Sequence, residues 1–454
     1  MIVYANLYPV SYSPKTGTVS WADRMTVHIP TEPEQKPLPY VVPKRASLAW
    51  VQDLQIENPQ LIEHEAHLSA SLRSERPMAS GLCDPDADYQ YVIVTSQEMA
   101  NAATDLTIHD LIAHRQAKGL TATIVLVEDI FTTYPGADDA EKLRNFIIDA
   151  YTNWGTTHVL LGGDTNVVPM RKLWVQAWPG SQYIEQVPSD LYYQCLDGNY
   201  NFDGDDLWGE PTDGPDGEDV DLLSEVVIGR ASAEDAEEMS NFIYKTLYYE
   251  TAPSSARFLR NALMVGEYLG FGGIADYAKS SMEEIRLGSD LHGYVTSGFA
   301  QAPLFAVSTL YDQEGEWQKD AITSALNNDQ LGIINHLGHA NIDYVMKFRN
   351  PDGDALHNRD PLFAYSQGCL PGNFEADCIA EHLTTSNRSG MFAVVFNSRY
   401  GWGMQNSTDG PSQRFNRQFW DAFIEERLAS LGAINADSHE DNLWAIQRPL
   451  YSLV

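Results

Sequence analysis

The chain has 454 residues, of which 43% are hydrophobic and 11% aromatic, a content typical of a folded globular protein rather than a disordered one. Its formal net charge of -34 argues against nucleic acid or an anionic membrane as a partner, and it would attract cationic substrates. The sequence has no run of about eighteen apolar residues, so we expect no membrane-spanning helix, and its length predicts more than one domain.

The N-terminal part begins with short segments that alternate apolar and polar residues. This pattern predicts three β-strands, at residues 3–7, 18–21 and 25–29. The polar stretch that follows contains Arg73 and Arg76, which predict either a processing site or an ordinary interdomain linker. The first residues lack the layout of a signal peptide, so the protein is either intracellular or its sequence begins after export processing.

A regular alternation of strand and helix patterns begins after residue 87. The strands are expected at residues 91–95, 121–127 and 158–163, and the helices at residues 105–118 and 139–153. This order predicts an α/β fold with a mostly parallel sheet and helices on both of its faces.

An acidic loop follows this region. With Asn199 as position 1, oxygen ligands fall at positions 1, 3 and 5, a glycine at position 6 and a glutamate at position 12, as in a calcium loop. The pattern predicts a structural Ca²⁺ site made by Asn199, Asn201, Asp203, Asp205 and Glu210. The alternative is an acidic, solvated surface loop, because asparagine is a weak first ligand and no flanking helices are evident.

Three apolar runs near the C-terminal end carry the residues most suited to chemistry. The first ends at Gly338 and His339, the second ends at Cys369, and the third, residues 391–396, leads into an aromatic loop with Trp402. Parallel buried strands bring their carboxyl ends to one sheet edge, where open α/β sheets build sites. We therefore predict a Cys–His active site, with an oxyanion hole made by the backbone N–H groups of Cys369 and Ala340.

Two alternatives to this active site remain. A lone cysteine is more often a small buried hydrophobic residue, and a lone histidine is more often structural, so the pair is stronger evidence than either residue. The soft ligands His336, His339, Cys378 and His382 could instead form a metal site. The four cysteines, Cys83, Cys195, Cys369 and Cys378, are too scattered for a disulfide framework, and we expect mostly free thiols.

The chain resembles the gingipain-type cysteine peptidases of the caspase-like clan. The resemblance is clearest at the Gly338-His339 turn and at Cys369-Leu-Pro-Gly-Asn-Phe374, about thirty residues later. It extends upstream through Tyr91-Val-Ile-Val-Thr95, Val159-Leu-Leu-Gly-Gly-Asp164, Glu225-Val-Val-Ile-Gly-Arg230 and Leu263-Met-Val-Gly-Glu267. One departure is Ala340, where many relatives carry glycine.

The resemblance implies a caspase-like α/β/α sandwich with a mostly parallel central sheet, preceded by a short β-rich prodomain remnant. The expected parts are residues 1–86 for the remnant and linker, 87–250 for a first α/β subdomain with the acidic loop, 251–431 for the catalytic subdomain, and 432–454 for a C-terminal tail that forms a last helix or leads to a further module. It also implies a secreted zymogen, extracellular or at the cell surface.

The resemblance further implies an endopeptidase that acts on proteins or peptides and cleaves after Arg or Lys. Glu267 is expected to orient His339. Asp276 is expected at the floor of the specificity pocket, with a helix N-cap as its alternative role, and Trp402 at the pocket wall. The alternative function is a catalytically inactive, calcium-binding adhesion or interaction module on the same fold. The natural substrate and the oligomeric state stay open.

Overall fold

The computed structural model describes residues 10–13, 18–21, 81–177, 183–214, 217, 219–302, 304–328 and 330–443. The chain divides into two compact units, Met1–Pro39 and Tyr40–Val454.

In the first unit, β1 (Val10–Ser13) and β2 (Thr18–Trp21) form an antiparallel hairpin in which Val10 pairs with Trp21. The strand predicted at residues 18–21 is confirmed. The strand β1 was not predicted, because prolines bracket it on both sides and proline normally marks a break. The strands predicted at residues 3–7 and 25–29 lie outside the described residues, as do Arg73 and Arg76.

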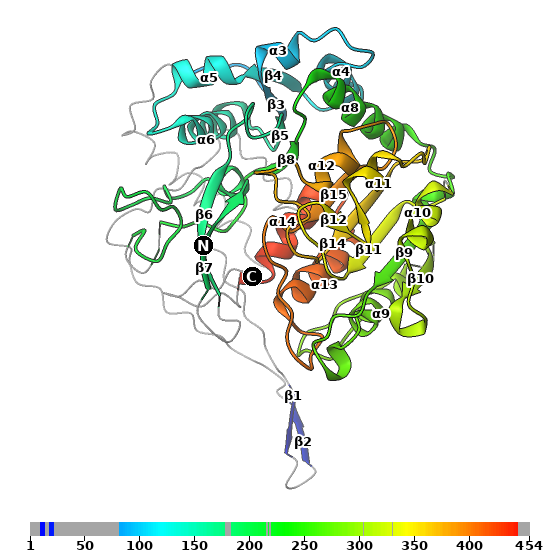
Figure 1. Ribbon diagram of the computed structural model, residues 1–454. Coiled ribbons are helices and arrows are strands. Elements are labelled where there is room, and N and C mark those ends of the chain that lie inside the picture. The colour runs from blue at the N-terminus through cyan, green and yellow to red at the C-terminus, as the bar shows by residue number, and fades with distance from the viewer. Residues whose placement is uncertain are drawn as a thin grey trace. The chain divides into compact units, whose positions relative to one another are not determined.

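The second unit begins with a four-stranded, wholly parallel sheet (Figure 1). Its strands, in spatial order, are β4 (Ala122–Leu126), β3 (Tyr91–Thr95), β5 (His158–Gly162) and β8 (Val227–Ala231). All five residues of β3 are buried, since helices cover both faces of the sheet and this interior strand is almost wholly apolar. The strands and helices predicted in this region are confirmed to within a few residues.

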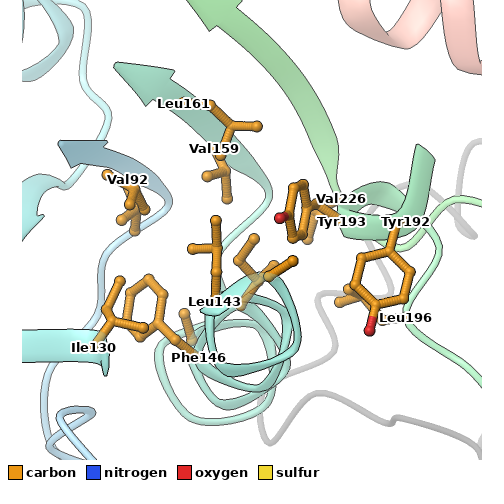
Figure 2. Packing of buried hydrophobic residues seen from close by; sticks show 14 of the residues in the cluster. Val92, Ile130, Leu143, Phe146, Val159, Leu161, Tyr192, Tyr193, Leu196 and Val226 are labelled. Atoms are coloured by element: carbon orange, nitrogen blue, oxygen red, sulfur yellow. The ribbon is translucent and has the colours of Figure 1, made fainter. Parts of the chain in front are cut away.

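Alternate residues of each strand pack into different clusters on the two faces. Val92 of β3 packs with α6 (Asp139–Asp149), and Figure 2 shows Leu143 and Phe146 of that helix beneath the sheet. The opposite face packs against α4 (Ile108–Ala117) and α8 (Ala236–Thr251).

The second sheet has five parallel strands (Figure 1). In spatial order these are β10 (Ala306–Tyr311), β9 (Asn261–Gly266), β11 (Ile333–Leu337), β14 (Leu362–Ser366) and β15 (Met391–Phe396). The three strands expected to carry the site, β11, β14 and β15, are adjacent and parallel, as predicted. Their carboxyl ends therefore lie along one edge.

Helices also cover both faces of this sheet. One face packs against α9 (Lys279–Leu287) and α13 (Pro411–Ile424), and the other against α10 (Lys319–Asn327) and α12 (Ile379–Thr384). The shorter elements are α3 (Gln97–Ala100), α5 (Val127–Thr133), α7 (Leu191–Gln194), β12 (Tyr344–Val345), β13 (Phe348–Arg349), α11 (Asn350–Asp354) and α14 (Leu431–Glu440). None of the helices within the described ranges is both long and apolar enough to cross a membrane.

One feature of the fold was not expected from the sequence. Between β5 and α7 the chain forms an antiparallel ribbon of β6 (Arg171–Ala177) and β7 (Tyr183–Ser189). The ribbon belongs to neither parallel sheet, and residues of both its strands line a cavity near the end of β14.

The two sheets are connected through α8 and the segment after α12. The Asn241 amide donates to the carbonyl of Thr385 at 3.1 Å, and the Lys245 ammonium donates to the carbonyls of Leu383 at 3.1 Å and Ser389 at 3.0 Å. Lys245 is fully buried, and burial lowers its pKa from 10.5 to about 7.

This lysine predicts a pH-dependent contribution to stability. Because its pKa is lower in the folded state, the unfolded chain binds the extra proton between about pH 7 and 10.5, and stability rises with pH across that window. Relative to Lys245→Met, the wild type should gain about 2 kcal/mol in free energy of unfolding between pH 7 and 9. Urea unfolding at the two pH values measures this gain, and an equal pH dependence in both proteins would contradict it.

Candidate active site

The strands β11 and β14 bring the two predicted catalytic turns to the same sheet edge. His336 and Ser366 are Cα partners in the parallel pairing, and the N–H of Gln367 donates to the carbonyl of His336 at 3.0 Å. His339 and Cys369 each follow this pair by three positions. Equivalent positions on adjacent parallel strands lie side by side, so the pairing brings the two turns together.

Two glycines allow the turns to touch. A Cβ on Gly368 would collide with the Cβ of Ala340 and would lie 3.2 Å from the carbonyl oxygen of Gly338. A Cβ on Gly338 would lie 2.5 Å from Nε2 of His336 and would collide with the carboxyl group of Glu267. Neither position has room for any side chain, which is a spatial reason for glycine beside both predicted catalytic residues.

The two predicted catalytic side chains are both at least partly accessible to solvent. His339 is exposed and Cys369 is half-buried, whereas the other three free cysteines are buried. Burial raises the pKa of the Cys369 thiol. The Cys369 thiol lies 3.8 Å from the carbonyl oxygen of Gly401. A thiol with a raised pKa needs a neighbouring base to become a nucleophile, and the predicted base, His339, lies on the adjacent turn.

The turn after Cys369 is held by the segment that follows β15. Leu370 has φ of 72°, a left-handed conformation that is uncommon for a residue with a side chain. Its N–H donates to the carbonyl of Arg399 at 2.7 Å, and the N–H of Gly372 donates to the carbonyl of Asn397 at 3.1 Å. These hydrogen bonds maintain a backbone conformation of the kind that clusters at functional sites.

Glu267 lies directly after β9 and only 4% of it is exposed. Its carboxylate accepts the backbone N–H of His339 at 3.3 Å and pairs with Nε2 of His336 at 3.1 Å. Glu267 thus contacts the main chain of the Gly-His turn and supports the residue that is the predicted base. Its expected role in orienting the His339 ring stays a prediction.

Asp276 lies in a loop that packs against the segment carrying Trp402. It is half-buried, and its carboxylate accepts the N–H of Gly272 at 3.3 Å. The N–H of Asn406 donates to the carbonyl of Phe271 at 3.0 Å, which joins the two loops. The alternative role of Asp276 as a helix N-cap is wrong, because the N-cap of α9 is Ala278.

A cavity of about 440 Å³ separates the β6–β7 ribbon from the ends of β14 and β15. The rings of Tyr183, Tyr400 and Trp402 line it, with the Trp402 ring 5.4 Å from Tyr183 and 6.0 Å from Tyr400. Gln367 also lines it, is only 4% exposed, and has no hydrogen-bond partner for either amide atom within the described part of the chain. Aromatic walls with a few unsatisfied polar groups are typical of ligand sites. Sequence reasoning missed Gln367, although its place two residues before Cys369 was a signal.

The acidic loop gathers three of its five predicted ligands. One oxygen each from Asp203, Asp205 and Glu210 lies within 4.8 Å of the others. The Asn201 amide donates to the carbonyl of Asp205 at 2.8 Å and leaves its own oxygen buried without a partner. In contrast to the oxygen of Asn201, the side-chain oxygen of Asn199 has a partner, since it accepts the N–H of Asn201 at 2.8 Å. Clustered carboxylates and a buried amide oxygen without a partner fit a hard cation such as Ca²⁺.

A further carboxylate organises this loop from within. Asp213 is fully buried and accepts the N–H groups of Phe202, Gly209 and Glu210, the last two at 2.9 and 3.0 Å. Burial raises its pKa to about 6. Nothing in the amino-acid sequence distinguishes Asp213 from its acidic neighbours.

The alternative metal site is not assembled. His336 is hydrogen-bonded to Glu267 and Ser366, Cys378 is fully buried, and His382 pairs with the carboxylates of Asp354 and Asp377. Among the described residues, the groups that could hold a metal ion consist of carboxylates, namely Asp203, Asp205 and Glu210, and Glu426, Asp437 and Asp441.

Comparison with known proteins gives a family match over most of the chain. Residues 84–451 match the sequence profile of peptidase family C25. Gingipain R2 of Porphyromonas gingivalis is 24% identical over 294 residues, which are 62% of this chain and 33% of that protein. Gingipain R1 of the same organism is also 24% identical over 62% of this chain and 25% of its own length. The chain thus spans a third or less of the length of these relatives.

Solved structures share the fold. The crystal structure of the Arg-specific cysteine proteinase gingipain R superposes with a TM-score of 0.58 at 20% identity, over 78% of this chain and 72% of that chain. The complex of Porphyromonas gingivalis RgpB pro- and mature domains gives a TM-score of 0.57 at 19% identity, over 77% of this chain and 73% of that chain. The α/β architecture is therefore caspase-like, as the resemblance implied.

The contact between the two turns predicts how Gly368 responds to substitution. Gly368→Ala should lower the free energy of unfolding by about 1–3 kcal/mol, because the new methyl group overlaps Ala340. Adding Ala340→Gly should recover part of the loss, since the overlap is then removed. Gly229→Ala is the matched control, because a Cβ there would meet nothing within 4 Å. Urea unfolding of the four proteins measures these changes, and equal losses in Gly368→Ala and the double variant would contradict the contact.

Proposed function

Because the chain belongs to peptidase family C25, we propose that it is a cysteine endopeptidase in which Cys369 is the nucleophile and His339 the base. The observation that supports this proposal is the contact between the turns at Gly338–Ala340 and Gly368, because His339 belongs to the first turn and Cys369 directly follows Gly368. The accessibility of Cys369, compared with the three buried thiols, supports the same assignment.

The proposed reaction follows from these positions. His339 accepts the thiol proton, the thiolate of Cys369 attacks the substrate carbonyl, and the imidazolium gives the proton to the leaving amine. Water then hydrolyses the acyl-enzyme with His339 again as base. The N–H groups of His339 and Gly368 already donate to Glu267 and Ser366. We therefore assign the oxyanion to the next N–H groups, those of Ala340 and Cys369, a contribution typically worth a few kcal/mol of barrier.

We propose Arg or Lys at the cleaved position. Asp276 supplies a half-buried carboxylate in a loop that packs against the segment of Trp402, so that a cation could pair with the carboxylate while its stem lies along the ring. The net charge of -34 would attract such substrates, and the similar crystal structure is that of an Arg-specific proteinase. An extracellular or cell-surface location stays a prediction from resemblance.

We also propose a structural Ca²⁺ ion at Asp203, Asp205 and Glu210, with the side-chain oxygen of Asn201 as a further ligand. Bound there, the ion would offset the mutual repulsion of the three carboxylates. Asn199, the fifth predicted ligand, stays a prediction, and its side-chain oxygen also accepts the N–H of Asn201.

A panel of fluorogenic peptides that end in Arg, Lys or Asp tests the proposed activity. We expect cleavage after Arg or Lys, a loss of kcat/KM of roughly a thousandfold or more in Cys369→Ala, and no loss in Cys83→Ala, which removes a buried thiol of the first sheet's core. Asp276→Asn should lower kcat/KM for basic peptides about 10-fold to 100-fold. Activity that survives Cys369→Ala would refute the nucleophile, and cleavage after Asp alone would refute the basic pocket.

Removal of Ca²⁺ should destabilise the wild type. At a Ca²⁺ concentration 100 times the dissociation constant, binding should add about 2.7 kcal/mol to the free energy of unfolding. Thermal unfolding with Ca²⁺ and with chelator should show this difference in the wild type and in Asp206→Asn, an exposed carboxylate outside the cluster. The difference should vanish in Asp205→Asn with Glu210→Gln. A chelator effect that persists in this double variant would place the ion elsewhere.

A further inference from the structure

We propose that Glu267, His336 and Ser366 form a buried hydrogen-bonded chain that fixes the two catalytic turns relative to each other. The inference rests on the proposed function, since it assigns these three as positioning residues for Cys369 and His339. They come from three adjacent strands, at or just after the carboxyl ends of β9, β11 and β14.

The contacts of the chain run continuously from one turn to the other. The N–H of His339 donates to Glu267 at 3.3 Å, and the other carboxylate oxygen lies 3.1 Å from Nε2 of His336. Nδ1 of His336 lies 2.8 Å from the hydroxyl of Ser366, which accepts the N–H of Gly368 at 3.2 Å. Each end of the chain is thus a backbone N–H, one in His339 and the other directly before Cys369.

The partners at the two ring nitrogens of His336 restrict its hydrogen bonds. An ionised carboxylate only accepts, so Nε2 carries the hydrogen that bonds to Glu267. The hydroxyl of Ser366 can donate to Nδ1 or accept from it, so every group in this hydrogen-bonded chain has a partner.

Burial separates this chain from the catalytic groups. His336 is fully buried, and Ser366 and Glu267 are 1% and 4% exposed, so no substrate carbonyl can reach the Ser366 hydroxyl. The three residues have the composition of a Ser–His–Glu catalytic triad, but they lack access to substrate. They can affect the reaction only indirectly, through their hydrogen bonds with the backbone N–H groups of His339 and of Gly368, the residue before Cys369.

Gly338 leaves the space in which the hydrogen-bonded chain of Glu267, His336 and Ser366 forms. A side chain at this position would overlap the carboxyl group of Glu267 and would come within 2.5 Å of Nε2 of His336. The glycine before His339 therefore gives room for the pairing of Glu267 with His336, beyond any role in the turn itself. The hydrogen-bonded chain and the contact between the two turns depend on the same strand register.

Matched substitutions at His336 test the role of the hydrogen-bonded chain. His336→Leu removes both hydrogen bonds at similar volume, whereas His336→Gln keeps one donor and one acceptor and does not titrate. The first readout is the rate of alkylation of Cys369 by iodoacetamide across pH 5 to 10, followed by peptide mass spectrometry. The second is kcat and KM for the basic peptide that the wild type cleaves best, per active site titrated by alkylation.

We expect His336→Leu to lower alkylation of Cys369 at neutral pH about tenfold, to move the midpoint of the alkylation profile to higher pH, and to lower kcat about tenfold with KM nearly unchanged. His336→Gln should stay within about threefold of the wild type in both readouts. If His336→Leu does not fold, Ser366→Ala, which removes one hydroxyl group, should give the same direction of change.

Two results would overturn the proposal. One is a wild-type alkylation profile and wild-type kcat per titrated site in His336→Leu and Ser366→Ala, even with reduced stability, because the chain would then be structural only. The other is equal impairment in His336→Gln and His336→Leu. Absence of peptide cleavage in the wild type would refute the peptidase assignment instead, and the alkylation profiles would still decide whether the chain controls the thiol.

Discussion

The site depends on the contact between two strand-end turns that leave no room for a side chain. Parallel pairing of β11 with β14 aligns His336 with Ser366, and glycines at 338 and 368 let the following turns meet. His339 and Cys369 each lie three residues after this pair. A change in register would therefore separate the thiol from the imidazole, and it would also separate His336 from Ser366. The chemistry is therefore determined by backbone geometry before any side-chain contact is made.

Much of this arrangement could be predicted from the sequence, for physical reasons that differ between elements. The strands β14 and β15 are mostly apolar, and β11 is apolar apart from Asn335 and His336, so these three parallel strands and the shared edge at their carboxyl ends were predictable. The β6–β7 ribbon was missed, because its residues mix polar and apolar types without a clear period. The resemblance pointed to Glu267, but its contacts with His336 and with the backbone N–H of His339 were not predicted, since cross-strand contacts depend on a register that one sequence does not reveal.

The roles of His336 and Gln367 depend on contacts that form only in the folded protein. They precede the predicted catalytic residues by three and two positions. Ser366, the partner of His336, is the last residue of β14, and Gln367 directly follows it, so the two side chains point to opposite sides. One face buries a carboxylate, an imidazole and a hydroxyl that satisfy each other, and the other turns an amide without a partner toward a cavity. Without the packing of both faces, neither residue can be distinguished from a buried polar residue of the core.

The first half of the protein also supports the turn that follows Cys369, and Arg399 is one of the residues through which it does so. The guanidinium donates to Glu185 of β7 at 2.8 Å and to Asn373, in the turn after Cys369, at 2.8 Å. The carbonyl of the same residue accepts the N–H of Leu370, whose left-handed conformation needs such support. A planar guanidinium satisfied on several sides holds its neighbours more rigidly than a single ion pair would. The β6–β7 ribbon therefore supports the turn that carries the proposed nucleophile, and the second sheet alone does not explain how Cys369 is held.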